Sequence, residues 1–174
     1  MYIKRNKAFT LVELIVTLSV LAVIATIAVP SFQEYQAKQE ANSIFHKIAA
    51  INRYARSQSA ILRQNIVICP TLNLSNCQAN QWSHAWLVFV DQNRNRQVDA
   101  GETVLQIDQL KLKYGQLDWS GALSIPSVSY QAQTNLPIGS NGSVYYCSLK
   151  SAKHYKIVLS KMGHLRKEDL TSCS

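Results

Sequence analysis

One carboxylate lies inside an apolar segment that is long enough to cross a membrane. Glu13 is the single charged residue between Phe9 and Val29. A carboxylate within a bilayer is costly, and such a residue usually has a function and a partner of opposite charge. Cleavage between Ala8 and Phe9 would create that partner, because the new α-amino group of Phe9 is positively charged. The residue types and their spacing therefore predict an ion pair between Glu13 and an amine produced by proteolysis.

A second group of side chains has the oxygen ligands and the spacing of a calcium-binding loop. The residues at positions 1, 3, 5, 9 and 12 of this EF-hand-like loop are Asp91, Asn93, Asn95, Asp99 and Glu102. Apolar Val98 is at position 8, but Arg96 occupies position 6, where such loops have glycine for a sharp turn. The flanking segments also have the pattern of strands. Two interpretations stay open, a bound Ca²⁺ ion or a solvated β-hairpin whose Asn and Asp side chains form local turns.

Basic side chains concentrate towards the C-terminus, where they could neutralise phosphate groups. They are Lys150, Lys153, Lys156, Lys161, Arg166 and Lys167, with Glu168 and Asp169 offsetting part of the charge. The 174-residue chain has a formal charge of +8, of which its first eight residues carry +3. The remaining +5 is modestly basic. A solvated face is the usual meaning of such charges, and binding to nucleic acid is the alternative.

The sequence has no motif that predicts an enzyme or a small-molecule substrate. A nucleophile elbow, a phosphate-binding loop, a dinucleotide fingerprint and an HExxH site are all missing. The four histidines have no metal-ligand spacing. Cys147 and His154 could be drawn as a nucleophile and its base, but a disulfide-bonded cysteine is not such a nucleophile.

The segment that positions Glu13 is predicted to be one membrane-spanning helix. Phe9–Val29 contains 21 residues, and about 20 helical residues cross a bilayer. A secretory signal peptide has a shorter apolar core, of about 7–15 residues, and an A-x-A-like cleavage site. Lys4, Arg5 and Lys7 place the N-terminus on the cytoplasmic side by the positive-inside rule. The rest of the chain is therefore expected outside the cytoplasm.

The four cysteines are predicted to form two disulfides, because an exported domain folds in an oxidising compartment. Cys69 and Cys77 bracket a polar loop, and Cys147 and Cys173 flank the C-terminal segment. We favour these two pairs among the three possible pairings. Zinc is the competing interpretation, although the cysteines lack C-x-x-C spacing and a nearby pair of histidines.

Helical character continues beyond Pro30. Apolar residues recur at steps of three and four, with Phe45 beside them. They are Ala41, Ile44, Ile48, Ile51, Ala55 and Leu62. We predict one helix from about Phe9 to Ser59, bent near Pro30 because proline lacks the N–H that the helix needs. Its second half is expected to bury the apolar stripe.

After Arg63 the pattern changes to an alternation of period two, which predicts short strands. The predicted strands are Asn65–Cys69, Trp86–Val90, Thr103–Ile107, Ser127–Gln131, Ser143–Cys147 and Tyr155–Ser160. The predicted turn residues are Gly101, Gly115, Gly121, Pro126 and Pro137. Asn141-Gly142 is predicted to form a tight hairpin.

The N-terminal segment resembles the processing site of type IV prepilins and of type II secretion pseudopilins. The resemblance implies that a dedicated peptidase cuts before Phe9 and N-methylates it. It also implies that Glu13 pairs with the terminal amine of a neighbouring subunit, and that Pro30 kinks the helix. Ala8 departs from the glycine that usually precedes the cleavage site.

The segment Trp82–Asp91 resembles the tryptophan-flanked strand of GspH/FimT-type (FimU-like) minor pilins and pseudopilins, with Ala85 where that family often has glycine. The resemblance implies a pilin-like α+β fold, in which a long N-terminal helix packs on a head of antiparallel sheets. Its expected parts are a cleaved leader at 1–8, a transmembrane assembly helix at 9–30, an amphipathic helix at 31–62 and a β-rich head at 63–174.

This resemblance implies a structural subunit of a type IV pilus that joins a priming or tip complex. It also implies that the chain carries no cofactor. The loop from Asp91 to Glu102 leaves Ca²⁺ as an open possibility. The implied partners are other minor and major pilins, prepilin peptidase and the assembly platform of the bacterial inner membrane. The chain would span that membrane once with its head in the periplasm, and would enter a pilus or pseudopilus after assembly. An H-type pseudopilin of a type II secretion system is the alternative.

Gly163-His164-Leu165-Arg166 partly resembles the C-terminal G-R-x-R pattern of DNA-binding FimT-like pilins. His164 replaces the first arginine of that pattern. The resemblance implies that Arg166 contacts DNA during uptake, and Lys161 and Lys167 are expected to support it.

Overall fold

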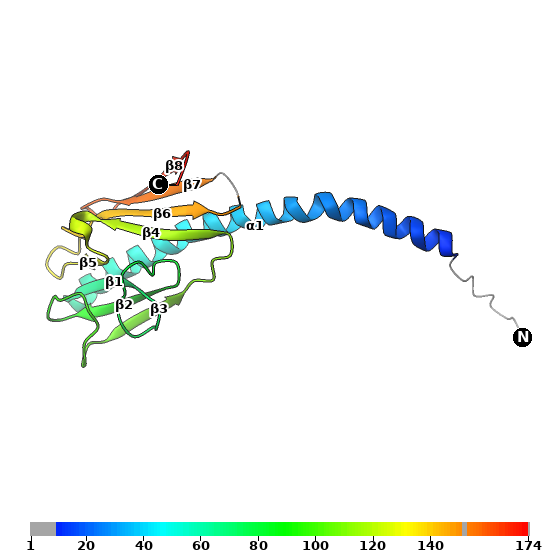
Figure 1. Cartoon of the computed structure of the whole chain (residues 1–174). Helices are drawn as coiled ribbons and strands as arrows, with labels where there is room; N and C mark the ends of the chain where they lie inside the picture. The colour runs from blue at the N-terminus through cyan, green and yellow to red at the C-terminus, as the bar shows by residue number, and fades with distance from the viewer. Residues whose placement is uncertain (1–9, 151–152, 174) are drawn as a thin grey trace, which may run out of the picture. The chain divides into compact units, whose positions relative to one another are not determined.

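The computed structural model describes residues 10–150 and 153–173. The chain divides between Gln36 and Ala37 into two compact units. One helix, α1 (Leu11–Leu62), supplies residues to both units (Figure 1).

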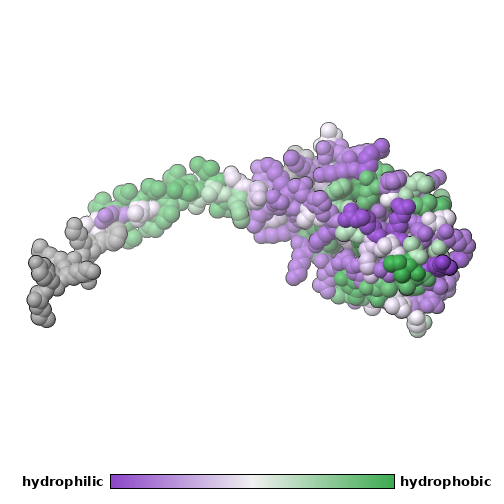
Figure 2. Space-filling view, turned by 180° about the vertical axis from the view of Figure 1, so that it is seen from behind, coloured by the Kyte–Doolittle hydropathy of each residue, from purple (hydrophilic) through white to green (hydrophobic). Residues whose placement is uncertain are grey.

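The first unit is the apolar part of α1. Its leucine, isoleucine and valine side chains are more than half exposed, and they form the hydrophobic surface of this segment in Figure 2. Among the described residues, α1 is the one helix long and apolar enough to cross a membrane. The helix continues through Pro30, as predicted.

The second unit contains the amphipathic part of α1. The predicted stripe is confirmed for Ala41, Ile44, Ile48, Ile51 and Ala55, which are all buried. The prediction is wrong for Leu62, which is 41% exposed. Leu62 ends the helix, and the following residue, Arg63, turns the chain towards the first strand with a φ of 52°.

Two four-stranded antiparallel sheets form the head with α1 (Figure 1). The first sheet has the order β3-β2-β1-β5. Its strands are β1 (Asn65–Thr71), β2 (Ala85–Asp91), β3 (Val104–Gln109) and β5 (Val128–Tyr130). The second sheet has the order β4-β6-β7-β8. Its strands are β4 (Gly115–Gly121), β6 (Gly142–Ser148), β7 (His154–Leu159) and β8 (Leu165–Leu170). A short 3₁₀ helix, η1 (Ala122–Ser124), follows β4.

The main hydrophobic core joins α1 to side chains from both sheets. Its largest fully buried side chains are Trp86, Tyr130, Tyr146 and Tyr155. A second cluster, formed by Val67, Cys69, Leu87 and Phe89, lies under Cys77 and Val98. Because β1 and β2 contribute alternate residues to both clusters, neither of their faces is solvated, which is why the Trp86–Val90 segment is a continuous apolar run.

Two strands were missed by the sequence analysis, and two predicted turns are wrong. Gly115 and Gly121 are the first and last residues of β4 rather than turns. A Cβ at Gly115 would overlap the ring of Tyr146, so this glycine gives the Tyr146 ring room beside the strand. β8 was missed because its run Arg166–Asp169 is charged, which is typical of an edge strand.

The predicted Asn141-Gly142 hairpin is also wrong. The strands on either side, β5 and β6, belong to different sheets, and Gly142 pairs with Gly121 at the start of β6. A Cβ on Gly142 would lie 2.5 Å from the backbone oxygen of Ser120 and 2.7 Å from the Trp119 ring. Close backbone approach, and not a tight turn, therefore requires this glycine.

Candidate functional site

Glu13 lies at the N-terminus of α1, in a capping box with Thr10. The N–H and hydroxyl of Thr10 donate to Glu13 Oε2 over 3.4 Å, and the Glu13 N–H donates to Thr10 Oγ1 over 3.2 Å. This arrangement satisfies donors that a helix start leaves without partners. Both side chains are exposed among apolar neighbours. Ala8 and Phe9, the predicted cleavage residues, lie outside the described part of the chain.

Both predicted disulfides are present. Cys69 is bonded to Cys77 and Cys147 to Cys173, the pairing that the sequence analysis favoured. The second bond ties the end of the chain to β6 and lies beside His154, whose Nδ1 is 3.2 Å from Cys173 Sγ. The sulfur atoms are therefore not thiolate ligands for zinc in this state.

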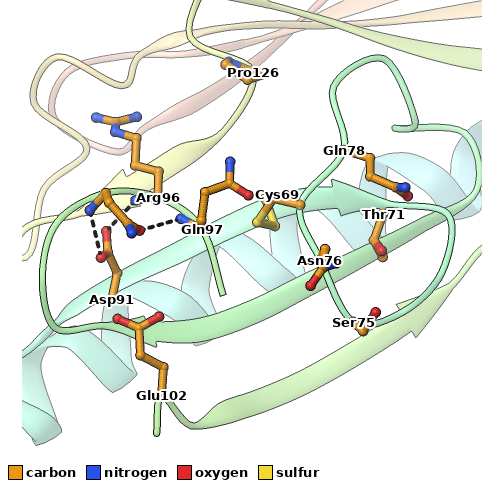
Figure 3. Close-up of a disulfide and its surroundings, with 12 residues drawn as sticks. Cys69, Thr71, Ser75, Asn76, Gln78, Asp91, Arg96, Gln97, Glu102 and Pro126 are labelled. Atoms are coloured by element: carbon orange, nitrogen blue, oxygen red, sulfur yellow. Dashed lines mark hydrogen bonds between the residues drawn. A yellow bond between two sulfur atoms is a disulfide. The ribbon is translucent and has the colours of Figure 1, made fainter. Parts of the chain in front are cut away.

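The predicted calcium ligands meet in the connection between β2 and β3, where one hydrogen-bond network contains them all. The Asp91 carboxylate accepts the N–H groups of Asn95 and Arg96, each over 3.2 Å (Figure 3). The side-chain amides of Asn93 and Asn95 donate to Asp99 over 2.7 and 2.6 Å. The Glu102 carboxylate closes the loop by accepting the N–H groups of Gln92 and Asp99 over 2.8 and 3.1 Å.

Arg96 forms the sharp turn at position 6 of the loop, where a calcium-binding loop usually has glycine. Its φ is 63°, in the left-handed region, and its N–H reaches Asp91. Its guanidinium donates to Ser140 Oγ over 2.8 Å and to the Ser127 carbonyl over 3.4 Å, which ties the loop to the segments that precede β6 and β5. Burial raises the pKa of Asp91, although the N–H groups of Arg96 and Arg94 act in the opposite direction.

The residues predicted to bind DNA do not share one face. Successive side chains of a strand point to opposite faces, so β8 separates Arg166 from Lys167. Arg166 is 74% exposed and contacts the Glu168 carboxylate, which also pairs with Lys156 over 2.8 Å. Lys167 lies over the Tyr155 ring, 4.3 Å from its centroid.

The turn between β7 and β8 brings other basic residues together. Lys161 is exposed in this turn. Gly163, which follows it, has a φ of 77°, and a Cβ there would lie 3.5 Å from Arg56 Nη1. The Gly163 carbonyl accepts from the Asn52 side chain over 3.2 Å. The glycine of the DNA-binding resemblance therefore has a structural role in docking this turn on α1, and the exposed Arg56 lies beside it.

Glu40 was not singled out by the sequence, yet it joins α1 to the second sheet. Its carboxylate accepts the N–H of Lys113 over 2.7 Å and the N–H of Tyr114 over 3.1 Å. It also accepts the Tyr146 hydroxyl over 3.0 Å. Burial first, and then the Glu40 charge, raise the pKa of Tyr146.

Comparisons with known proteins bear on both parts of the chain. The family model described as type II transport protein GspH matches residues 46–163, more than half of the chain. The model of the prokaryotic N-terminal methylation motif matches residues 3–29.

Among curated proteins, a fimbrial protein of Pseudomonas aeruginosa is 31% identical over 65 residues, which are 37% of this chain and 41% of that protein. The fimbrial protein EcpB of Eikenella corrodens is 33% identical over 46 residues, which are 26% of this chain and 29% of that protein. The chain thus matches less than half of the length of these relatives.

Among solved structures, the type IV minor pilin FimU of Pseudomonas aeruginosa is 15% identical, with a TM-score of 0.59. The match covers 80% of this chain and 99% of that one. It shows that the two chains share a fold.

A long N-terminal helix packed on antiparallel sheets, with a methylation motif that covers its first part, defines a pilin-like subunit. Its role is that of a structural subunit and not of an enzyme. The chain belongs to the GspH family of minor pilins and pseudopilins.

Proposed function

We propose that this chain is a minor pilin of a type IV pilus, a structural subunit of the priming or tip complex from which the filament grows. The observation that carries the proposal is the exposed Glu13 carboxylate in an apolar segment that has no other charge between residues 9 and 29. Such a charge needs a partner within the membrane, and a neighbouring subunit supplies one. The fimbrial relatives support a pilus over a secretion pseudopilus.

Deletion of the gene tests the proposal against its alternative. We expect loss of twitching motility with intact protein secretion. Loss of exoprotein secretion with intact twitching would instead identify an H-type pseudopilin. Complementation with the intact gene is the control, because it excludes effects on neighbouring genes.

Processing by prepilin peptidase is a further part of the proposal. We expect the mature chain to begin at Phe9 and to carry an N-methyl group, which leaves the head in the periplasm and one helix in the inner membrane. The intact mass of the membrane-extracted protein measures this. A mass that still includes Met1–Ala8 in cells with active peptidase would contradict it.

DNA binding is a second candidate function. It is favoured by three exposed basic residues: Lys161 in the β7–β8 turn, Arg166 on β8, and Arg56 on α1 beside this turn. Phosphate contacts of this kind give non-specific affinities of about 10⁻⁴–10⁻⁶ M. We expect Lys161→Gln with Arg166→Gln to weaken binding equally for all sequences and to reduce the salt slope by about 2, one for each contact. Glu168→Gln should strengthen binding, because it releases Arg166 and Lys156 from their carboxylate partner.

Fluorescence anisotropy with labelled duplex DNA and the detergent-solubilised chain measures these effects at two salt concentrations. Lys47→Gln, a change of an exposed lysine on α1, is the matched control. If the Lys161 and Arg166 changes have no more effect than this control, the basic turn is a solvated face.

Calcium binding by the β2–β3 loop stays a prediction. If the dissociation constant is about 1 mM, as in extracellular calcium modules, then 10 mM Ca²⁺ would stabilise the fold by about 1.4 kcal/mol. That corresponds to a rise in Tm of roughly 3–5 °C. Asp99→Ala or Glu102→Ala should abolish the rise, whereas Asp169→Ala, outside the loop, should preserve it. An unchanged Tm of the unsubstituted chain would identify the loop as a turn held by its own hydrogen bonds.

A further inference from the structure

The imidazole of His154 is oriented towards the C-terminal disulfide. The sulfur atoms of Cys147 and Cys173 and a ring nitrogen of His154 all lie within 4.8 Å of one another. The Ser148 N–H donates to His154 Nδ1 over 3.2 Å. In a neutral imidazole, the nitrogen that accepts a hydrogen bond carries the lone pair and the other carries the proton. Nδ1 is thus the basic nitrogen, and it is the one 3.2 Å from Cys173 Sγ.

The two disulfides have different surroundings. Cys69 is fully buried against Val67, Leu87 and Phe89, whereas its partner Cys77 is half-buried, so an external thiol can approach this bond only at Cys77. Cys173 is exposed and Cys147 is half-buried. Within residues 10–150 and 153–173, the only cluster of three or more cysteine, histidine and acidic side chains close enough to share a ligand is the one at the C-terminal disulfide. The Cys69–Cys77 bond therefore has one buried and one half-buried sulfur, whereas the Cys147–Cys173 bond has an exposed sulfur with a base beside it.

We propose that Cys147–Cys173 is a site of thiol–disulfide exchange in which His154 accepts and returns the proton, and that its partner is a dithiol oxidoreductase. During closure, Nδ1 gives up the Ser148 N–H and takes the proton of the Cys173 thiol, and the thiolate attacks the partner's disulfide to form a mixed disulfide and one partner thiolate. The Cys147 thiol then loses its proton and attacks Cys173 Sγ, which releases the second partner thiolate. Two protein thiols are oxidised to one disulfide, the partner disulfide is reduced to two thiols, and the two protons pass to the partner. Reduction follows the same steps in reverse.

Other charged groups lie near His154 and affect the equilibrium between thiol and thiolate. Lys38 on α1, Lys153 before β7, and Lys167 and Asp169 on β8 line a pocket with it. The net positive charge of this set favours a thiolate over a thiol. A substitution at His154 retains these groups, so comparing it with the original chain isolates the effect of the imidazole.

The expected size of the effect follows from thiol chemistry. A cysteine with a pKa of about 8.5 is roughly 3% thiolate at pH 7, and one lowered to about 7 by a neighbouring histidine is about half thiolate. The nucleophilicity of the thiolate falls by roughly fivefold over the same range. The net gain in the exchange rate is therefore about three- to fourfold at pH 7.

The decisive variant is His154→Asn, because its side-chain oxygen takes the position of Nδ1 and can still accept the Ser148 N–H but cannot take a proton at neutral pH. The full-length chain, extracted from membranes, is reduced with dithiothreitol and then reoxidised with oxidised glutathione between pH 6 and pH 9. Alkylation followed by peptide mass mapping measures the rate of each disulfide separately. The Cys69–Cys77 bond in the same molecule is the internal control.

We expect His154→Asn to slow closure of Cys147–Cys173 by about three- to fourfold at pH 7, with a steeper dependence of the rate on pH. Opening should also be slower, because the cysteine is then a less acidic leaving group. The rates for Cys69–Cys77 and the Tm of the oxidised chain should not change. Equal rates and equal pH profiles in the two chains would overturn the proposal and leave His154 with a purely structural role. An equal slowing of both disulfides would also overturn it, since that pattern reports a general effect on folding. The opening rate is measured from the folded, oxidised chain, so it decides the question even if the reduced variant refolds poorly.

Discussion

Replacing Glu13 with valine is expected to remove the subunit from surface filaments while leaving it in the inner membrane. Insertion should be preserved, because the substitution removes a polar group from an apolar segment. Assembly should fail, because the terminal amine of a neighbouring subunit would be left as an unpaired charge among apolar side chains. An unpaired charge at the centre of a membrane helix costs about 2.5–3.5 kcal/mol. We therefore expect at least a roughly tenfold loss of subunit from sheared filaments.

Immunoblots of sheared filaments and of membranes measure the two pools. Thr17→Val is the matched control, because Thr17 is exposed in the same apolar segment and its hydroxyl donates only to the Leu14 carbonyl of its own helix. It should assemble normally. Normal assembly of the Glu13→Val chain would rule out the proposed ion pair, and loss of that chain from the membrane would indicate a defect in insertion instead.

Replacing Glu40 with alanine is expected to give a large loss of stability in the head. The substitution leaves the N–H groups of Lys113 and Tyr114 and the hydroxyl of Tyr146 without their shared acceptor. Hydrogen bonds to charged groups each contribute about 1.5–3 kcal/mol, and groups left without partners in a partly buried site add a desolvation cost. Because Glu40 is half-buried and water can replace part of the loss, we expect the free energy of unfolding to fall by about 2–4 kcal/mol.

Urea denaturation of the solubilised chain, followed by tryptophan fluorescence, measures this change. Glu40→Gln keeps one acceptor oxygen and should lose only about half as much. Lys47→Ala, an exposed change on the same helix, should stay within about 0.5 kcal/mol of the original chain. A Glu40→Ala chain as stable as the Lys47→Ala control would show that this carboxylate does not hold α1 to the second sheet.

Several features could be predicted because the information for them is local in the chain. The apolar run with Glu13 is contiguous, so its length and composition predict a helix able to cross a membrane without any tertiary contact. The stripe from Ala41 to Ala55 follows from the helical period alone. The loop Asp91–Glu102 is also local, and its side chains meet within twelve positions. The two disulfides could be paired because each favoured pair brackets its own segment of the chain.

Other features depend on residues that are far apart in the sequence. Glu40 lies 73 and 74 positions from the two N–H groups that it accepts and 106 positions from Tyr146, so no local pattern marks it. Gly115 and Gly142 look like turn residues, but their lack of a Cβ allows close approach of side chains and backbone between paired strands. The edge strand β8 has a charged run that resembles a loop until it pairs with β7.

The long apolar helix, the buried stripe, the cysteine pairs and the class of protein could be predicted from the chain alone, because periodicity, composition and short motifs encode them. The composition of each sheet, the opposite orientation of Arg166 and Lys167 on β8 and the contact of His154 with the C-terminal disulfide became visible in the folded molecule. The physical reason is that strand pairing and side-chain packing are set by contacts between distant residues. The free energy of those contacts depends on how the whole core is filled, and not on the neighbours along the chain.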